Sequence, residues 1–210
     1  MKKDFRQRVH KYYNTFAPTY DLGEFFRRGT RSAVVQASGC QPGDSALEIC
    51  SGTCELALAF ARRGVHTIAV DLARSMLLLG RKKSIFPHLE FLETDALALP
   101  FASKSFDAVV ISLALHHMPE GIQVRVLSEM ERLARRKVIT LEWHTPNTAF
   151  RQKLKGAAIR LMDISEHLRP WMHQDFPATC QAAGLVVEGH QVLTAGFHRL
   201  TICRPAIKPI

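Results

Sequence analysis

The feature that most constrains the fold is an alternation of short apolar runs and helical patterns that begins near residue 44. Runs of this length, rich in Val, Ile and Leu and separated by helical patterns, predict parallel strands joined by helices that cover both faces of one sheet. The predicted strands are SALEIC at 45–50, HTIAVD at 66–71, LEFLE at 89–93, FDAVVIS at 106–112 and KVITLEW at 137–143. The helices between them are predicted near Thr53–Arg63, Arg74–Lys83 and Gly121–Arg135.

The two ends of the chain complete the predicted architecture. FPATCQAAGL, at 176–185, predicts a helix that ends at Gly184, and the two runs after it, 186–196 and 197–204, predict an antiparallel hairpin at the sheet edge. Helices are also expected before the first strand, near Asp4–Tyr13 and Gly23–Ser38. The expected fold is α/β: a Rossmann-like, doubly wound, mostly parallel seven-stranded sheet with an antiparallel edge hairpin and N-terminal helices.

Composition narrows the class of protein. The chain has 210 residues and 47% hydrophobic residues, which suits one domain with a buried core. No apolar run reaches the ~20 residues of a membrane span, and the charged N-terminus has no apolar signal-peptide segment. Five cysteines at irregular spacing predict free thiols in the cytoplasm and no metal site. The net charge of +9 suits an anionic partner, but the basic residues are scattered, so nucleic acid is not expected.

A small-residue turn follows the first predicted strand. Ser51, Gly52 and Thr53 let backbone amides approach a ligand, as in turns that cradle a nucleotide-like cofactor. Cys50 and Cys54 flank them, and a residue with a β-carbon is not expected to adopt positive φ there. The pattern G-x-G-x-x-G of dinucleotide-binding turns is absent.

Two acids follow the next two strands. Asp71 lies about 20 residues after the turn, where a carboxylate accepts hydrogen bonds from ribose hydroxyls. Asp95 follows the third strand, where it is placed to accept from an adenine amino group while Ala96 leaves room for the ring. Each acid alone has a structural alternative, such as capping a turn. Their order along the chain favours an adenosine carrying an amino acid over a dinucleotide.

These motifs resemble those of the class I S-adenosylmethionine (SAM)-dependent methyltransferases, and within them the ubiquinone/menaquinone biosynthesis C-methyltransferases. The resemblance covers about residues 13–196 and is carried by YNTFAPTYD, DALALPF…SFD, VVISLALHHM, ITLEW and VLTAG. The chain departs from the family in keeping one glycine of the usual three in the first turn. His116 and His117 also stand where the quinone branch has Arg-Asn.

The resemblance implies SAM as cofactor and assigns a role to particular residues. Glu48 and the turn Cys50–Thr53 would line the methionine part, and Asp71 would hold the ribose. The remaining cofactor contacts that it implies are Leu72, Met76, Asp95 and Ala96 around the adenine, Ser112 at the end of the fourth strand, and Tyr13 and Tyr20 closing over the cofactor. Residues 1–40 would form the N-terminal helical segment, 41–145 the SAM-binding core, 146–183 a substrate-side lid and 184–204 the edge hairpin, all in one domain.

Histidines at the expected reaction face point to acid–base chemistry. His116 and His117 follow the fourth strand, and imidazole titrates near neutral pH, so either can serve as the base that deprotonates an acceptor. The alternative is that one of them caps the loop. Glu142 is either a polar wall of the pocket or a structural partner, and Trp143 either contacts an aromatic acceptor or packs in the core.

The acceptor is the least defined part of the prediction. A small molecule is expected, such as a quinone-like, phenol-like or lipid-tailed compound. The segment TAFRQKLKGAAIRLMDI, at 148–164, reads as a basic amphipathic helix, which is either a lid or a contact with an anionic membrane. Two alternatives stay open: a nucleic-acid methyltransferase, and a SAM-binding protein without transferase activity. The oligomeric state is not predicted.

Overall fold

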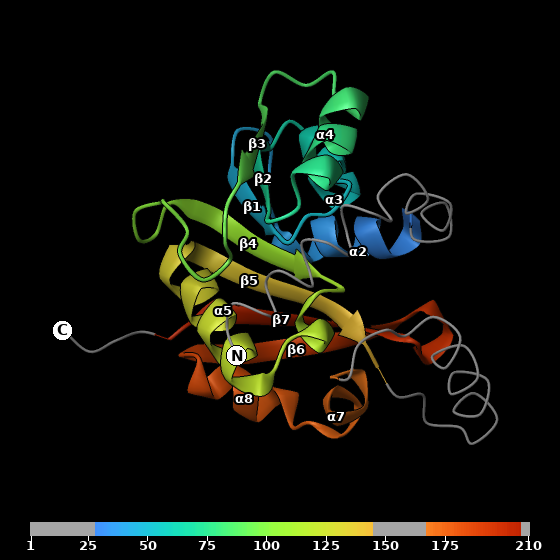
Figure 1. The fold of residues 1–210 in the computed structure, drawn as a ribbon, viewed down its shortest axis with the longest axis vertical. Helices are drawn as coiled ribbons and strands as arrows, with labels where there is room; N and C mark the ends of the chain where they lie inside the picture. The colour runs from blue at the N-terminus through green and yellow to red at the C-terminus, as the bar shows by residue number, and fades with distance from the viewer. Residues whose placement is uncertain (1–27, 145–166, 207–210) are drawn as a thin grey trace.

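A seven-stranded sheet forms the centre of the molecule (Figure 1). The computed structural model describes residues 28–144 and 167–206. The strand order is β3-β2-β1-β4-β5-β7-β6. β1 pairs in parallel with β2 and β4, whereas β7 runs antiparallel to both β5 and β6. This arrangement confirms the predicted fold class, including the hairpin at the edge.

The strands and helices lie close to their predicted positions. The strands are β1 Ser45–Ile49, β2 His66–Asp71, β3 Leu89–Glu93, β4 Phe106–Ser112, β5 Ala134–Trp143, β6 Leu185–Leu193 and β7 His198–Pro205. The α-helices are α2 Arg28–Ser38, α3 Glu55–Ala61, α4 Arg74–Lys83, α5 Glu120–Leu133, α7 Leu168–His173 and α8 Phe176–Ala182. Among residues 28–144 and 167–206, the 3₁₀ turns are η2 Leu115–His117 and η3 Thr194–Gly196.

One boundary differs from the prediction and has an electrostatic reason. The helix expected to reach Arg135 ends at Leu133, and β5 begins at Ala134. Arg135 and Arg136 extend along the strand, where Arg136 contacts Asp44 at 2.6 Å and both guanidinium groups lie 3.5 Å from Asp107. The basic run that reads as a helix end is therefore the start of a strand whose cations meet acids at the amino end of the sheet.

Two hydrophobic layers sandwich the sheet. On one face, α2 and α3 pack on residues such as Ala46, Val110 and Ile139. On the other face, α5 and α8 pack on residues such as Leu47, Ile49 and Val109, while α7 closes the same side near the ends of the strands (Figure 1). Consecutive residues of β1 thus face opposite layers, as a strand buried on both faces requires.

The topology decides where a ligand can bind. The chain order reverses between β1 and β4, and in open α/β sheets ligands bind beyond the carboxyl ends of the strands at this reversal. Strands β1, β2, β4 and β5 run parallel to one another, so their carboxyl ends lie at that edge (Figure 1). Within the ranges that the structure describes, no helix is both long and apolar enough to cross a bilayer.

Candidate active site

The turn after β1 corrects one expectation from the sequence. Cys50, Gly52 and Cys54 all adopt positive φ, at 54°, 52° and 62°. Hydrogen bonds impose this path: the Ser51 amide donates to the carbonyl of Val70 at 3.0 Å, and the Cys54 amide donates to the carbonyl of Ser51 at 2.8 Å. The two cysteines therefore adopt the left-handed geometry that the expectation reserved for glycine, and we expect a conformational cost of about 1–2 kcal/mol for each.

A small residue on α4 makes room for the second cysteine. A β-carbon added at Gly80 would lie 2.5 Å from the Cys54 sulfur and 2.7 Å from its β-carbon. Cys54 is fully buried, and burial raises the pKa of its thiol. Cys54 is therefore a packing residue whose side chain fits because position 80 has none.

Two carboxylates tie this turn to the elements around it. Glu48, 3% exposed at the end of β1, accepts a hydrogen bond from the amide of Ala57 in α3 at 2.8 Å. Asp71, at the end of β2, accepts from the amides of Gly52 and Ala73 through its two oxygens, each at 2.8 Å. Burial raises the pKa of Asp71, and the backbone amides that donate to it oppose that effect. The turn and the tip of β2 are thus one hydrogen-bonded unit.

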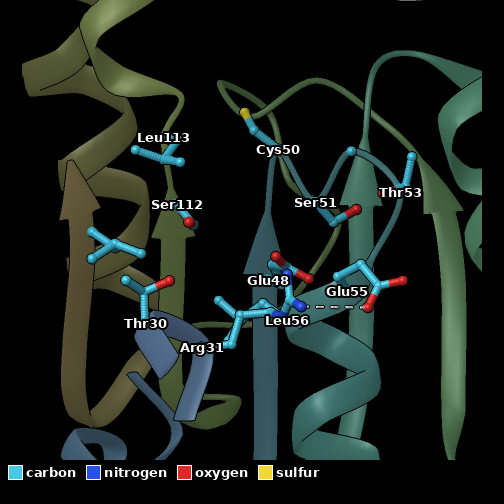
Figure 2. A pocket seen from close by; sticks show the side chains of 12 residues that line it. Thr30, Arg31, Glu48, Cys50, Ser51, Thr53, Glu55, Leu56, Ser112 and Leu113 are labelled. Carbon is cyan, nitrogen blue, oxygen red and sulfur yellow. Dashed lines mark ion pairs between the residues drawn. The ribbon is translucent and has the colours of Figure 1, made fainter. Parts of the chain in front are cut away.

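A pocket of about 50 Å³, open to solvent, lies beside this unit (Figure 2). Six residues implied by the family resemblance line it: Glu48, Cys50, Ser51, Gly52, Thr53 and Ser112. The sequence prediction missed the other lining residues, which are Thr30, Arg31, Glu55, Leu56, Leu113 and Leu141.

Arg31 is the most informative of the missed residues. It projects from α2 toward Glu48 and the turn in Figure 2, and its guanidinium lies 4.0 Å from Glu55. Its side chain is 12% exposed. A largely buried arginine at the wall of a pocket suits a bound carboxylate, since the guanidinium group pairs with that group in two parallel hydrogen bonds. No motif in the sequence identifies Arg31, because only the packing of α2 against α3 brings it to this wall.

The residues expected around the ribose and the adenine lie outside the lining of this pocket. Asp71 is joined to it through Gly52, while Asp95 accepts a hydrogen bond from the amide of Leu97 at 2.9 Å. Leu72 and Ala96 are half-buried, and Met76 of α4 is buried against Ala73. Their assignment to the cofactor stays a prediction.

The electrostatics of the turn are negative. Burial raises the pKa of the Cys50 thiol well above its usual range, and the carboxylates of Asp71, Glu142, Asp95 and Glu48 raise it further, in that order. Four acids from four strand ends therefore act on one sulfur atom. A high pKa keeps Cys50 a thiol at neutral pH, which argues against a redox role. The same field favours a cation bound next to the turn.

A second turn, after β4, is organised by Glu142 of β5. Its Oε1 atom accepts hydrogen bonds from the amides of Ala114 and Leu115, at 2.9 and 2.8 Å, and its Oε2 atom lies 2.7 Å from Nδ1 of His116. The side chains of Glu142 and His116 are 2% and 4% exposed. Of the two alternatives that the sequence left open for Glu142, the structure shows the partner of His116.

His117 lies beside the His116–Glu142 pair, and its ring has an altered pKa. Its ring centroid is 4.0 Å from that of His116. Burial, followed by the charges of His116 and His167, lowers the pKa of His117 to about 3, so its ring is neutral at physiological pH. His167 and Trp171, with Met118 and Gln123, line a second cavity of about 210 Å³ on this side of the sheet. Trp171 donates from Nε1 to the carbonyl of Trp143 at 3.0 Å.

Several predictions fall on residues outside the described ranges. These are Tyr13 and Tyr20, the helix expected near Asp4–Tyr13 and the basic segment at 148–164. All five cysteines are free thiols, as expected. Among residues 28–144 and 167–206, no group of three or more His, Cys, Asp or Glu side chains is arranged to hold a metal ion.

Comparison with known proteins finds methyltransferases. Residues 46–137 match the family model described as a methyltransferase domain. A demethylmenaquinone methyltransferase of Renibacterium salmoninarum is 30% identical over 186 residues, covering 78% of this chain and 77% of that protein. One of Mycobacterium sp. (strain JLS) is 30% identical over 222 residues, covering 96% and 91%. The magnesium protoporphyrin IX methyltransferase of Synechocystis PCC 6803, solved with bound S-adenosylhomocysteine (SAH), superposes with a TM-score of 0.74 at 17% identity, covering 95% of this chain and 99% of that one.

Proposed function

The chain belongs to the class I SAM-dependent methyltransferases, and on that premise we propose that it methylates a phenol-like small molecule, such as a reduced quinone. Two relatives that share 30% of their residues with it carry the name demethylmenaquinone methyltransferase. The His116–Glu142 pair supports the same class of acceptor, because a phenol becomes a strong nucleophile only when a base removes its proton.

The residues at the carboxyl ends of β1 and β2 fit the cofactor. When bound, SAM supplies an electrophilic methyl group on a positively charged sulfur atom. The observation that carries the proposal is the geometry of the turn after β1, where Asp71 accepts from the Gly52 amide and Glu48 lines the same pocket as Cys50. The carboxylates of Glu142 and Asp95 act on the Cys50 thiol together with these two acids. Their negative field favours the sulfonium cation over the neutral product that remains after transfer, and so favours exchange of product for fresh cofactor.

Each part of the cofactor has a matching group in the chain. The oxygens of Asp71 accept two backbone amides and keep lone pairs for ribose hydroxyls. Asp95 is proposed to accept from the adenine amino group. Arg31 is proposed to pair with the methionine carboxylate, opposite the acids that would hold the sulfonium and the amino group. This arrangement matches the charges of the amino-acid end with opposite charges of the pocket.

His116 is the proposed general base. Its turn continues directly from Ser112 and Leu113, which line the cofactor pocket. His117 is not suited to the same role, because a pKa of about 3 makes its ring a poor proton acceptor at neutral pH. The sequence named both histidines, and the structure favours the first.

Substitution of the base tests this proposal. We expect His116→Ala to lower kcat by at least about 100-fold, the contribution of a positioned base, and to leave the Kd for SAM unchanged. The assay follows tritiated methyl transfer to a reduced, short-chain demethylmenaquinone, with calorimetry for SAM. His190→Ala, an exposed position on β6, is the matched control. Near-normal turnover of His116→Ala would remove this residue from the mechanism.

Contact with a membrane stays a separate proposal. The basic amphipathic segment at 148–164 suits an anionic bilayer, which would give access to a lipid-tailed acceptor in a cytoplasmic enzyme. Sedimentation with vesicles of phosphatidylglycerol and phosphatidylcholine tests it. We expect binding that decreases with salt, and no binding at low salt would reject the proposal.

A further inference from the structure

We propose that Glu142 is a positioning residue that selects the tautomer of His116, so that the lone pair of the ring lies on Nε2. The inference rests on the proposed function, because a tautomer matters to turnover only if the ring accepts a proton from the acceptor. It extends that function by naming the residue that makes the imidazole a base and the atom that takes the proton.

The hydrogen bonds of Glu142 leave its carboxylate little freedom. Oε1 accepts from two backbone amides, of Ala114 and Leu115, and a backbone N–H can only donate. Oε2 faces His116 Nδ1 at 2.7 Å. The carboxylate is 2% exposed, so water does not replace these donors. A buried carboxylate is stabilised by the hydrogen bonds that it accepts, and this one therefore requires a proton on Nδ1.

The position of that proton determines the chemistry of the other nitrogen. A neutral imidazole has one N–H and one lone pair, so a proton on Nδ1 leaves the lone pair on Nε2. Within the described part of the chain, the hydrogen bond to Glu142 is the only one that the His116 ring makes. Nε2 is thereby left to accept a proton from a bound molecule.

The proton step balances within these groups. The O–H bond of the acceptor breaks, its electron pair stays on the acceptor as the nucleophile, and a new N–H bond forms at Nε2. The ring becomes an imidazolium ion that faces the Glu142 carboxylate, so the new positive charge is paired inside the protein. The proton later passes from Nε2 to water, which restores the neutral ring.

Glu142 also links the base to the wall of the cofactor pocket. The turn that it holds includes Leu113, whose φ of 53° is unusual for a residue with a branched side chain. Leu113 lines the cofactor pocket, and its amide donates to the carbonyl of Leu141 at 2.7 Å. One carboxylate on β5 therefore holds both the reactive ring and the neighbouring pocket wall in place.

The substitution Glu142→Gln shows whether Glu142 orients the His116 ring or only fills the space beside it. The amide side chain keeps the size of glutamate, but its NH₂ group cannot face the two backbone amides. Its oxygen must stay with Ala114 and Leu115, so its NH₂ group faces His116 Nδ1, which then becomes the acceptor. The ring proton moves to Nε2, and the base is lost although the fold is kept.

The experiment has an activity readout and a spectroscopic one. We expect Glu142→Gln to lower kcat at least about 100-fold for the reduced, short-chain demethylmenaquinone, while the acceptor KM and the SAM Kd change by less than about threefold. In ¹⁵N-histidine spectra, the His116 signal, assigned by its loss in His116→Ala, should report the Nδ1–H tautomer in the wild type and the Nε2–H tautomer in the variant. Glu90→Gln, at an exposed position on β3, is the control.

Two results would overturn the inference: a wild-type His116 ring protonated on Nε2, or a folded Glu142→Gln protein with normal kcat. The wild-type spectrum decides even if the variant does not fold. Failure of the proposed function would look different. The wild-type protein would bind SAM but methylate neither this quinol nor other phenols, whichever nitrogen of His116 carries the proton.

Discussion

The turns after β1 and β4 lie at the same edge of the sheet, and both hold non-glycine residues at positive φ, but different interactions stabilise them. The turn after β1 is held mostly by its own backbone and by Asp71 at the tip of the adjacent strand. The turn after β4 is held by Glu142, a side chain 27 or 28 residues away along the chain. We propose that the first turn contacts the cofactor and that the second holds the imidazole ring that deprotonates an acceptor.

At one edge of the sheet, therefore, one turn is held mainly by backbone hydrogen bonds and the other by a buried side chain. The turn that is proposed to bind the cofactor depends on backbone geometry, which tolerates cysteine at positive φ at a modest cost. The ring that is proposed as the base needs a defined orientation, and a buried carboxylate with three hydrogen-bond donors provides it. Substitutions that affect the turn after β1 should therefore change the Kd for SAM, whereas substitutions that affect the turn after β4 should change kcat.

The largest effect is expected at Asp71, which supports the first turn. Asp71→Asn removes one of the two carboxylate oxygens, leaving an amide of Gly52 or Ala73 without its acceptor and the ribose without a charged one. We expect the SAM Kd to rise about 100-fold, since hydrogen bonds to charged groups contribute about 1.5–3 kcal/mol each. Calorimetry measures it, with Glu90→Gln as the control. An unchanged Kd would dissociate Asp71 from the cofactor.

Arg31 should matter for one end of the cofactor only. Arg31→Met keeps the apolar stem and removes the charge, so we expect SAM to bind about 30-fold more weakly while 5′-methylthioadenosine, which lacks the amino acid, binds as before. Equal losses for the two ligands would show that Arg31 supports the fold of the pocket and does not bind the carboxylate.

The packing of Cys54 against α4 gives a smaller effect on stability. Gly80→Ala places a methyl group within 2.5 Å of the Cys54 sulfur, so we expect it to reduce the free energy of unfolding by about 1.5 kcal/mol. Cys54→Gly should remove most of this penalty when the two changes are combined, because the clash is then limited to the Thr53 carbonyl at 3.1 Å. Urea unfolding of the four proteins tests the cycle, and strictly additive effects would contradict it.

The smallest effect concerns His117, in the turn after β4, and the free energy of unfolding at acid pH. His117 has a pKa of about 3 when folded and about 6.5 when unfolded, so between these values the unfolded chain binds the extra proton and stability falls as the pH falls. The ring is half-buried, and we expect a loss of about 1 kcal/mol between pH 7 and pH 5. His117→Gln should lose less over this range in urea unfolding. Parallel curves for the two proteins would show that His117 does not titrate in this way.

The sequence predicted the sheet better than it predicted the conformation of either turn. The strands were predictable because short β-rich runs alternate with helices, and the position of Asp71 at the end of β2 follows from that pattern. The conformation of Cys50 and Cys54 was not predictable, since hydrogen bonds to Val70 and within the turn override the preference of a residue with a β-carbon.

Long-range packing explains what the sequence did not reveal. Arg31 reaches the pocket only because α2 packs on α3, and no periodicity encodes that contact. The sequence named His116 and left the role of Glu142 open, because the pairing of β4 with β5 brings them together across 26 residues. The start of β5 was misplaced because a basic run is compatible with a helix end until its partners, Asp44 and Asp107, are known.

A crystal structure of the protein with S-adenosylhomocysteine tests the central claim most directly. The account predicts ribose hydroxyls within hydrogen-bond distance of Asp71, the adenine amino group near Asp95, the amino-acid carboxylate at Arg31 and the sulfur atom next to the Cys50 turn. Adenosine bound away from both aspartates, or no binding at millimolar concentration in the same crystals, would contradict it.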